Sequence, residues 1–358
     1  MIRRIGTGVA FFAGVTLAVF LAIRAGLKPI AHAIAAVGWD GLFETCALQL
    51  VSVFLCAAAW WAVTDKTAFR ACFLSRWIRD GATTLVGPAI GEGISARALA
   101  LLSGNGGGAA AATTIVDVAV EALSQAVYTL VAFAVLFPHL RPGQSLRWDI
   151  IVAASLLPVI LMFAVTLSRR ALVVAQRLAE KVARMFGAGP GSGFDLARAV
   201  ETIYGKRGRI SIALCLHIVA WTTGAAQVWL IGRAIGAPIT IWDGLALHGL
   251  VCAARSAAFI VPWAAGVQEG GFLLVGGVLH LSPATAIAMS LVLRGRDVVL
   301  GAPAILAWYL AEARRAVSRD PTPIPPTAPA QAGAHGSARA AGMGVRLDGS
   351  PPSRGHSD

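Results

Sequence analysis

Ionisable side chains interrupt the apolar stretches of this sequence, and eight of them are its strongest candidates for chemistry. A charged side chain in a membrane-type segment costs at least about 2.5–3.5 kcal/mol, so such groups usually pair with one another or line a polar path. An arginine in such a path can bind a phosphate or a polyol. The eight candidates for binding a lipid headgroup are Glu92, Arg97, Asp117, Glu121, Glu269, Arg294, Arg296 and Asp297.

The spacing of these residues leaves two interpretations open. Asp117, Glu121 and Gln125 recur every four residues, which places them in one stripe along a helix. Arg294 and Asp297 are three residues apart and can pair on one helix face. The charges are either structural ion pairs that hold a helix bundle together or a polar cradle for a headgroup. The cradle would consist of Glu92, Arg97, Glu269, Arg294 and Asp297, with Arg255 nearby.

Two apolar segments that carry these charges are interrupted by helix-breaking residues. "VGPAIGEGISARALALL" (86–102) and "VPWAAGVQEGGFLLVGG" (261–277) both run from proline through small residues and glycine to a Glu-Gly pair. Proline removes a backbone donor, and glycine loosens the helix. At membrane depth, backbone freed in this way is tolerated only inside protein or along a wet cavity. The expected broken-helix positions are Gly87, Pro88, Gly91, Gly93, Pro262, Gly266, Gly270 and Gly271.

The two broken segments occupy matching places in the two halves of the chain. Paired segments of this kind indicate the binding site of a transporter with inverted repeats. The charges of the flanking loops predict that the first segment enters from the cytoplasm and the second from outside. The alternative is chance similarity, because glycine and proline are frequent in membrane helices.

The composition indicates the class of fold that positions these residues. The chain has 358 residues, of which 57% are hydrophobic and only 13% charged, against roughly 25% charged residues in soluble domains. Repeated apolar runs predict an all-α, polytopic transmembrane helical bundle with two re-entrant segments. The predicted spans are 5–23, 41–63, 109–137, 148–167, 210–235, 244–262 and 284–311, with an interfacial piece at 28–38.

The positive charge indicates orientation and partners. The net charge is +12, and the basic residues gather in two internal loops, around Lys66 to Arg79 and in 168–209. By the positive-inside rule these loops and both termini lie in the cytoplasm, which predicts a multi-pass protein of the bacterial inner membrane. Anionic lipids are the expected partners. No module supports binding of nucleic acid.

The sequence contains no motif for a metal site, a disulfide framework or a phosphate loop. The five cysteines show no C-x-x-C spacing, the seven histidines form no H-E-x-x-H pattern, and "GNGGG" (104–108) lacks the strand and the Lys-Ser/Thr of a phosphate loop. We therefore expect no metal, no cofactor and no catalytic residue. His217 and His248 are interpreted as packed polar groups. We predict a membrane domain at 1–318 and a disordered tail at 319–358, which is rich in Pro, Gly, Ala and Ser.

The two halves resemble a known family. "FIVPWAAGVQEGGFLLVGGVLHLSPATAIAMSLVLRGRDVVLGAPAILAWYL" (259–310) is similar to the C-terminal half of the flippase-like membrane proteins related to the transmembrane region of lysylphosphatidylglycerol synthase. "SRWIRDGATTLVGPAIGEGISARALAL" and "TTIVDVAVEALSQ" resemble the N-terminal half. The similarity covers nearly all of 1–316 and is strongest to the branch associated with hopanoid biosynthesis.

The resemblance implies a protein that moves or presents a lipid, such as an anionic phospholipid or a hopanoid. The synthases carry a cytoplasmic aminoacyltransferase domain after the membrane part, whereas here only the tail follows, so aminoacyl transfer is not expected. Two alternatives stay open. One is an intramembrane lipid-modifying transferase with Asp117 or Glu121 as the base, and the other is a scaffold for hopanoid-biosynthesis enzymes.

Overall fold

The computed structural model describes residues 2–104, 106–139, 196–258 and 261–319, and the regular elements in these ranges are helices and 3-10 turns. The prediction of an all-α fold is confirmed. The compact unit Met1–Arg315 contains the features below. The expected helix 148–167, most of the basic piece 168–209 and the tail after residue 319 lie outside the described residues.

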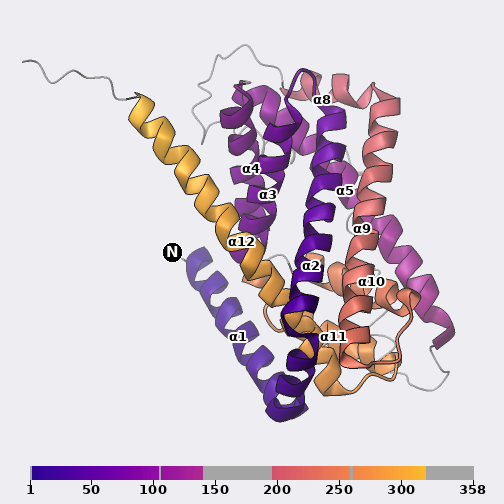
Figure 1. Ribbon diagram of the computed structural model, residues 1–358. Coiled ribbons are helices and arrows are strands. Elements are labelled where there is room, and N and C mark those ends of the chain that lie inside the picture. The colour runs from indigo at the N-terminus through magenta and orange to yellow at the C-terminus, as the bar shows by residue number, and fades with distance from the viewer. Residues whose placement is uncertain (1, 105, 140–195, 259–260, 320–358) are drawn as a thin grey trace, which may run out of the picture. The chain divides into compact units, whose positions relative to one another are not determined.

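The described helices form two series with the same order of long and short members (Figure 1). The first series is α2 (Leu27–Val63), α3 (Phe69–Leu85), α4 (Pro88–Ser103) and α5 (Gly107–Leu136). The second is α9 (Arg207–Ile235), α10 (Ile241–Ala257), α11 (Val267–Val278) and α12 (Pro283–Arg319). The other elements are α1 (Ile2–Ala25), α8 (Leu196–Tyr204) and the 3-10 turns η1 (Phe137–His139) and η2 (Pro262–Ala264).

The two series run in opposite directions. In Figure 1, α2 rises from the lower end of the bundle, whereas α9 descends beside it from the upper end. The hairpin α3–α4 therefore lies in the upper half of the view and the hairpin α10–α11 in the lower half. The two hairpins meet tip to tip, because α3 contacts η2. This arrangement supports an inverted repeat over chance similarity of the two broken segments.

Three described helices are long and apolar enough to cross a membrane, namely Leu27–Val63, Gly107–His139 and Arg207–Ile235. The first of them joins the piece 28–38, expected at the membrane interface, to the expected span 41–63. The boundary between these two pieces is a kink at Gly38, whose φ of 60° and ψ of −167° are not helical. Glycine is one of the few residues that permit such a kink without a proline.

The first break lies at Gly87, between α3 and α4. Its φ of 142° is a conformation that side chains with a Cβ rarely adopt. Pro88 then begins α4, where its missing N–H leaves no helical hydrogen bond unmade. Gly91 follows one turn later and faces Thr83, so closely that an added Cβ would lie 2.0 Å from the threonine hydroxyl oxygen. The glycines thus let α4 return tightly against α3.

The second break is longer and lies between α10 and α11. It contains the 3-10 turn η2, which begins at Pro262 and in which Trp263 and Ala264 have positive φ values of 61° and 46°. Non-glycine residues in this region are strained and persist only where the surroundings hold them. Gly266, with φ 74°, precedes α11. Four of the expected broken positions, Gly91, Gly93, Gly270 and Gly271, lie inside helices instead.

Arg76 and Arg79 correct the interpretation of the first basic loop. The sequence places them in a cytoplasmic loop, but both lie on α3, and their exposed fractions are only 4% and 7%. The loop itself is confined to residues 64–68. A short polar helix and a loop have similar compositions, so the local sequence did not distinguish them.

Helix α12 of the second series crosses α3 of the first hairpin at a contact of small residues. A Cβ added at Gly81 would lie 2.8 Å from Cβ of Ala304 and 2.9 Å from the carbonyl oxygen of Gly301. Such contacts allow helix backbones to approach closely. Beside them the indole of Trp77 donates to the carbonyl of Leu300 at 3.1 Å. This contact ties the two series together.

Apolar packing fixes the helices whose polar faces form the site. One cluster of buried side chains joins α5, α9, α10, α11 and α12 and includes Leu247 and Phe272. Another joins α2, α3, α4, α5, α8 and α9 and includes Trp60. Fully burying one such large side chain contributes about 1.5–3 kcal/mol.

We expect Gly91→Ala to destabilise the protein by about 1–3 kcal/mol, because the added methyl group must push α4 away from Thr83. Thermal unfolding of the detergent-solubilised protein measures the loss. Gly270→Ala is the matched control, since nothing lies within 4 Å of its added Cβ and alanine favours a helix. Equal unfolding temperatures for the two variants would contradict the tight hairpin.

Asp65 links the end of α2 to the start of α9 outside the apolar segments. Its carboxylate lies 2.5 Å from Lys206 Nζ and from Arg209 Nη1. The hydrogen bonds from these two cations lower the pKa of Asp65 below its usual value of about 3.8. The contribution to stability is therefore present above about pH 4 and is lost as the pH falls through the lower folded-state pKa.

We expect Asp65→Asn to reduce the free energy of unfolding by no more than about 1 kcal/mol at pH 7, because the side chains are exposed to solvent. The difference between this variant and the wild type should shrink as the pH falls below 4. Denaturant unfolding measured at several pH values tests the prediction. A difference that grows on acidification would contradict it.

Candidate functional site

A cavity of about 270 Å³ lies between the two hairpin tips. The first series contributes Arg76, Asp80 and Glu121 to its lining, and the second contributes Arg255, Trp263 and Asp297. Cavities that bind small ligands typically measure about 300–1,000 Å³, so this one is near the lower end. Its walls mix charged groups with serine, threonine, glutamine and tryptophan side chains. This mixture suits a polar group more than an acyl chain.

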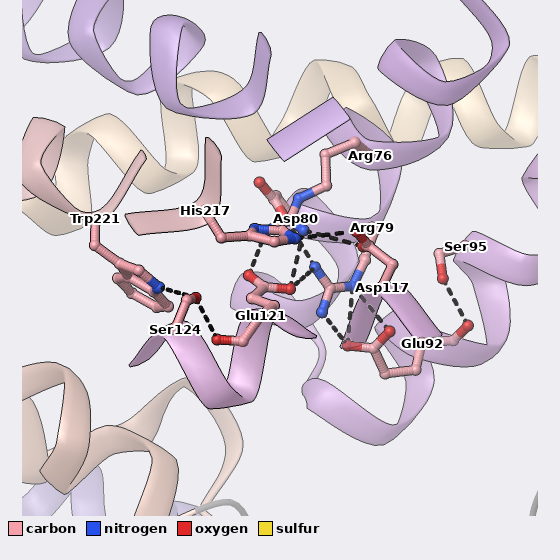
Figure 2. Close-up of polar contacts among 10 residues, drawn as sticks. All are labelled: Arg76, Arg79, Asp80, Glu92, Ser95, Asp117, Glu121, Ser124, His217 and Trp221. Carbon is pink, nitrogen blue, oxygen red and sulfur yellow. Dashed lines mark hydrogen bonds and ion pairs between the residues drawn. The ribbon is translucent and has the colours of Figure 1, made fainter. Parts of the chain in front are cut away.

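One wall of the cavity belongs to a cluster of seven titratable residues, which we call the charge cluster (Figure 2). Arg76 is its centre. The guanidinium donates to both oxygens of Glu121, at 2.9 and 2.6 Å, and lies 2.9 Å from Asp80 and 3.6 Å from Asp117. The members of the charge cluster are Arg76, Arg79 and Asp80 on α3, Glu92 on α4, Asp117 and Glu121 on α5, and His217 on α9.

Arg79 joins the hairpin to the same cluster. Its Nε donates to both oxygens of Glu92, at 2.9 and 2.8 Å, and its Nη1 lies 2.7 Å from Glu121 Oε2. Glu121 is therefore held by two guanidiniums. Bidentate pairs of this kind are the strongest charged hydrogen bonds and fix the orientation of both groups.

The charge cluster is not electrically balanced. It contains four carboxylates and two guanidiniums, which leaves two negative charges beyond the arginines when His217 is neutral. His217 has no exposed surface, and its Nε2 lies 3.0 Å from Asp117 Oδ1. Uncompensated charge is costly where solvent is scarce. The protonation of His217 therefore matters for the electrostatics of this wall.

A second group of charges holds the break between α10 and α11. Arg294 on α12 donates to both oxygens of Glu269, at 2.5 and 3.0 Å. It also donates to the carbonyl of Trp263 at 3.0 Å and to that of Ala264 at 3.3 Å, while Glu269 accepts from the backbone of Gly266 at 2.9 Å. We call this arrangement the break clamp. It satisfies backbone groups that the interrupted helix leaves without partners.

Arg296 and Asp297 form a third group on α12. Arg296 donates to its neighbour Asp297 and to Gln227 on α9. Gln227 in turn donates to Gln49 on α2 at 3.3 Å. Within the described part of the chain, Asp297 Oδ2 is buried without a hydrogen-bond partner. Asp297 also belongs to the lining of the cavity.

The opposite wall carries aromatic groups and another cation. His248 Nδ1 lies 3.2 Å from the hydroxyl of Tyr128, whose ring stacks on Trp221. Arg255 lies one turn beyond Cys252 on α10 and also lines the cavity. Among the described residues no carboxylate lies within ion-pair distance of Arg255. Arg255 is thus the cavity cation that is not neutralised within the described ranges.

The eight residues predicted from the sequence do not form one cradle. Asp117, Glu121 and Glu92 come together in the charge cluster, whereas Glu269 and Arg294 form the break clamp. The expected local pair between Arg294 and Asp297 is wrong, because the two side chains bind different partners. Glu269 and Arg294, which pair in the structure, lie far apart along the chain, so their spacing in the sequence did not indicate the pair.

Arg97 corrects the predicted cradle further. It pairs with Glu312 on α12 rather than with the charge cluster, and both side chains are 26% exposed. Arg97 is absent from the cavity lining, whereas Glu121, Arg296 and Asp297 belong to it. The pair connects α4 to α12 outside the cavity.

Sequence reasoning missed the residues of α3 and α9 that complete the charge cluster. Arg76 and Asp80 stand four residues apart, a spacing that would have indicated an ion pair had this stretch been read as a helix. His217 was expected to be a packed polar group, and its complete burial agrees with that. Its pairing with Asp117 had no signal in the sequence.

One set of donors in the cluster has the composition of a metal site. Cys56, Glu121 and His217 offer one ligand atom each, and these atoms lie within 4.8 Å of one another. Cysteine, histidine and carboxylate are the ligands of zinc. However, both oxygens of Glu121 already accept from Arg76, and one also pairs with Arg79. The residues therefore fit a metal poorly.

The residues that form most of this architecture also identify the family of the chain. The sequence profile of the lysylphosphatidylglycerol synthase TM region matches residues 7–304. The chain belongs to this family. The match to the lysylphosphatidylglycerol synthase TM region includes both hairpins, the charge cluster and the break clamp, and together with the apolar helices it identifies a membrane protein. Comparison with curated proteins and with solved structures finds no match.

We expect Arg294→Gln to destabilise the protein by about 3–5 kcal/mol, because it leaves Glu269 as a buried charge without its partner. The double change Glu269→Gln with Arg294→Gln should recover part of the loss. Arg97→Gln is the control, and the loss of its partly exposed ion pair should cost no more than about 1 kcal/mol. Thermal unfolding in detergent tests the order of the three variants, and equal losses for Arg294→Gln and Arg97→Gln would contradict the clamp.

Proposed function

We propose that the protein binds the headgroup of an anionic membrane lipid in the cavity and moves that lipid between the leaflets. The name of the family refers to a lysylated phosphatidylglycerol, which is a membrane lipid. A small polar cavity with apolar helices around it suits a headgroup whose acyl chains stay in the bilayer. The protein would then be a lipid carrier without a catalytic residue.

The observation that carries the proposal is Arg255. A guanidinium that lines a cavity and has no carboxylate beside it in the described ranges favours an anionic ligand. Phosphate accepts two parallel hydrogen bonds from arginine. Asp297 Oδ2 and the cavity hydroxyls can accept or donate further hydrogen bonds to a glycerol or another polyol.

The opposed hairpins suggest how the headgroup could cross. In transporters with inverted repeats, one repeat rocks against the other around a central site. Here the two tips meet at the cavity, where Thr83 comes from one tip and Trp263 from the other. Opening one tip contact at a time would expose the same cavity first to one leaflet and then to the other.

The location and the identity of the lipid stay predictions. The basic residues of 168–209 favour a bacterial inner membrane with both termini in the cytoplasm. The match is to the family as a whole, so membership of the hopanoid-associated branch rests on the resemblance alone. A hopanoid with a polyol headgroup and an anionic phospholipid are both compatible with hydrogen-bonding cavity walls.

We expect proteoliposomes that contain the protein to transfer a fluorescent phosphatidylglycerol between leaflets. Arg255→Gln should slow this transfer at least tenfold, because a charged hydrogen bond contributes about 1.5–3 kcal/mol. Dithionite quenching of the outer-leaflet label measures the rate. Arg233→Gln is the matched control, since Arg233 is exposed and stacks on Trp229 away from the cavity.

The outcomes separate the candidate functions. Transfer without chemical change, lost in Arg255→Gln and kept in Arg233→Gln, supports the carrier. A new lipid species on thin-layer chromatography would identify an enzyme instead. If folded wild-type protein transfers neither phosphatidylglycerol nor a hopanoid polyol, the carrier function is wrong. The role of a scaffold for other enzymes is then the remaining candidate.

A further inference from the structure

A buried pair of residues stands directly behind the charged wall of the cavity. His217 and Asp117 are 0% and 1% exposed, and His217 Nε2 lies 3.0 Å from Asp117 Oδ1. The other ring nitrogen, Nδ1, is buried and has no hydrogen-bond partner among the described residues. A fully buried polar atom without a partner is rare and calls for an explanation.

The groups around this pair come from three other elements. Arg76 Nη1 on α3 lies 3.6 Å from Asp117 Oδ2. Cys56 on α2 and Glu121 on α5 place ligand atoms within 4.8 Å of a ring nitrogen of His217. The titratable and charged residues that face the pair are Cys56 on α2, Cys72, Arg76, Arg79 and Asp80 on α3, Glu92 on α4, and Glu121 on α5.

The charge of the cluster favours uptake of a cation. Its four carboxylates exceed its two guanidiniums by two charges. A single proton on His217 halves this excess and gives Asp117 a charged partner. A divalent metal ion would remove the excess altogether, but Glu121, one of its three donors, is held by Arg76 and Arg79.

The pair also has a route to the cavity. Cys56, Arg76 and Glu121 belong to the cavity lining, whereas His217 and Asp117 lie one layer behind them. Water in the cavity is therefore separated from His217 by the side chains that contact it. These separating side chains are a thiol, a guanidinium and a carboxylate, which are polar groups.

We propose that the His217–Asp117 pair is the proton-binding site that couples lipid movement to a pH gradient, an inference that rests on the carrier function. A hydronium ion in the cavity gives its proton to the neutral imidazole, which becomes an imidazolium paired with the Asp117 carboxylate. When the cavity faces the other leaflet, the imidazolium returns the proton to water there. The lipid and the proton thus share one cavity.

The binding of the proton can be tested without any lipid. We expect the ¹⁵N spectrum of histidine-labelled protein in detergent to show one buried ring that changes its protonation within the pH range over which the protein stays folded. His217→Gln should remove this signal, and Asp117→Asn should move its titration by at least one pH unit. His32→Gln, on an exposed part of α2, is the control and should leave the signal unchanged.

The coupling is tested in proteoliposomes with a pH gradient. One proton per lipid shifts the steady-state ratio of labelled phosphatidylglycerol between the leaflets about tenfold per pH unit, because one unit equals 1.36 kcal/mol. This ratio does not depend on the transfer rate. It should follow the gradient in the wild type and in His32→Gln, and it should ignore the gradient in His217→Gln.

Each negative result would contradict a different claim. Absence of lipid transfer by the wild type would overturn the carrier function, and the spectrum alone would then decide whether the pair binds a proton. Transfer whose steady-state ratio ignores the gradient would overturn the coupling and keep the carrier. Stoichiometric zinc in the purified protein, lost in Cys56→Ser, would assign the excess charge to a metal ion and overturn the proton site.

Discussion

The buried charges of the break clamp and of the charge cluster depend on distant parts of the chain for their partners. The break clamp shows the constraint most clearly, because one guanidinium serves two backbone carbonyls of η2 and both oxygens of Glu269. Water would otherwise satisfy these groups, and the interior of a membrane protein offers little of it. The helix can be interrupted there because Arg294 is present on α12.

The two halves meet this constraint in different ways, although their helices follow the same order. The first break is short and relies on the positive φ of Gly87, with its charges engaged in the cluster on α3, α4 and α5. The second break is long and strained, and a charged side chain holds it in place. The two halves therefore share the order of their helices but not the residues that hold their breaks. This asymmetry gives the cavity one anionic wall and a cation, Arg255, that has no carboxylate partner among the described residues.

The sequence predicts the elements of this structure better than it predicts their contacts. Helical fold, broken segments and the stripe of Asp117 and Glu121 follow from periodicity and composition, which are local properties. The partner of Glu269 lies 25 residues away, and that of Arg97 lies 215 residues away. Pairing over such distances depends on how the helices pack, which a single sequence does not encode in any spacing. The same limit explains why Arg76, although its spacing to Asp80 was visible, was assigned to a loop.

The contact between Gly81 on α3 and Gly301 on α12 bears on the origin of the fold. It places the last helix of one half against the first hairpin of the other, so neither half completes its own packing. A half-length ancestor could have made these contacts only as a pair of copies inserted in opposite orientations. Fusion of two such copies would hold both hairpins in one chain and leave each half free to acquire a different break.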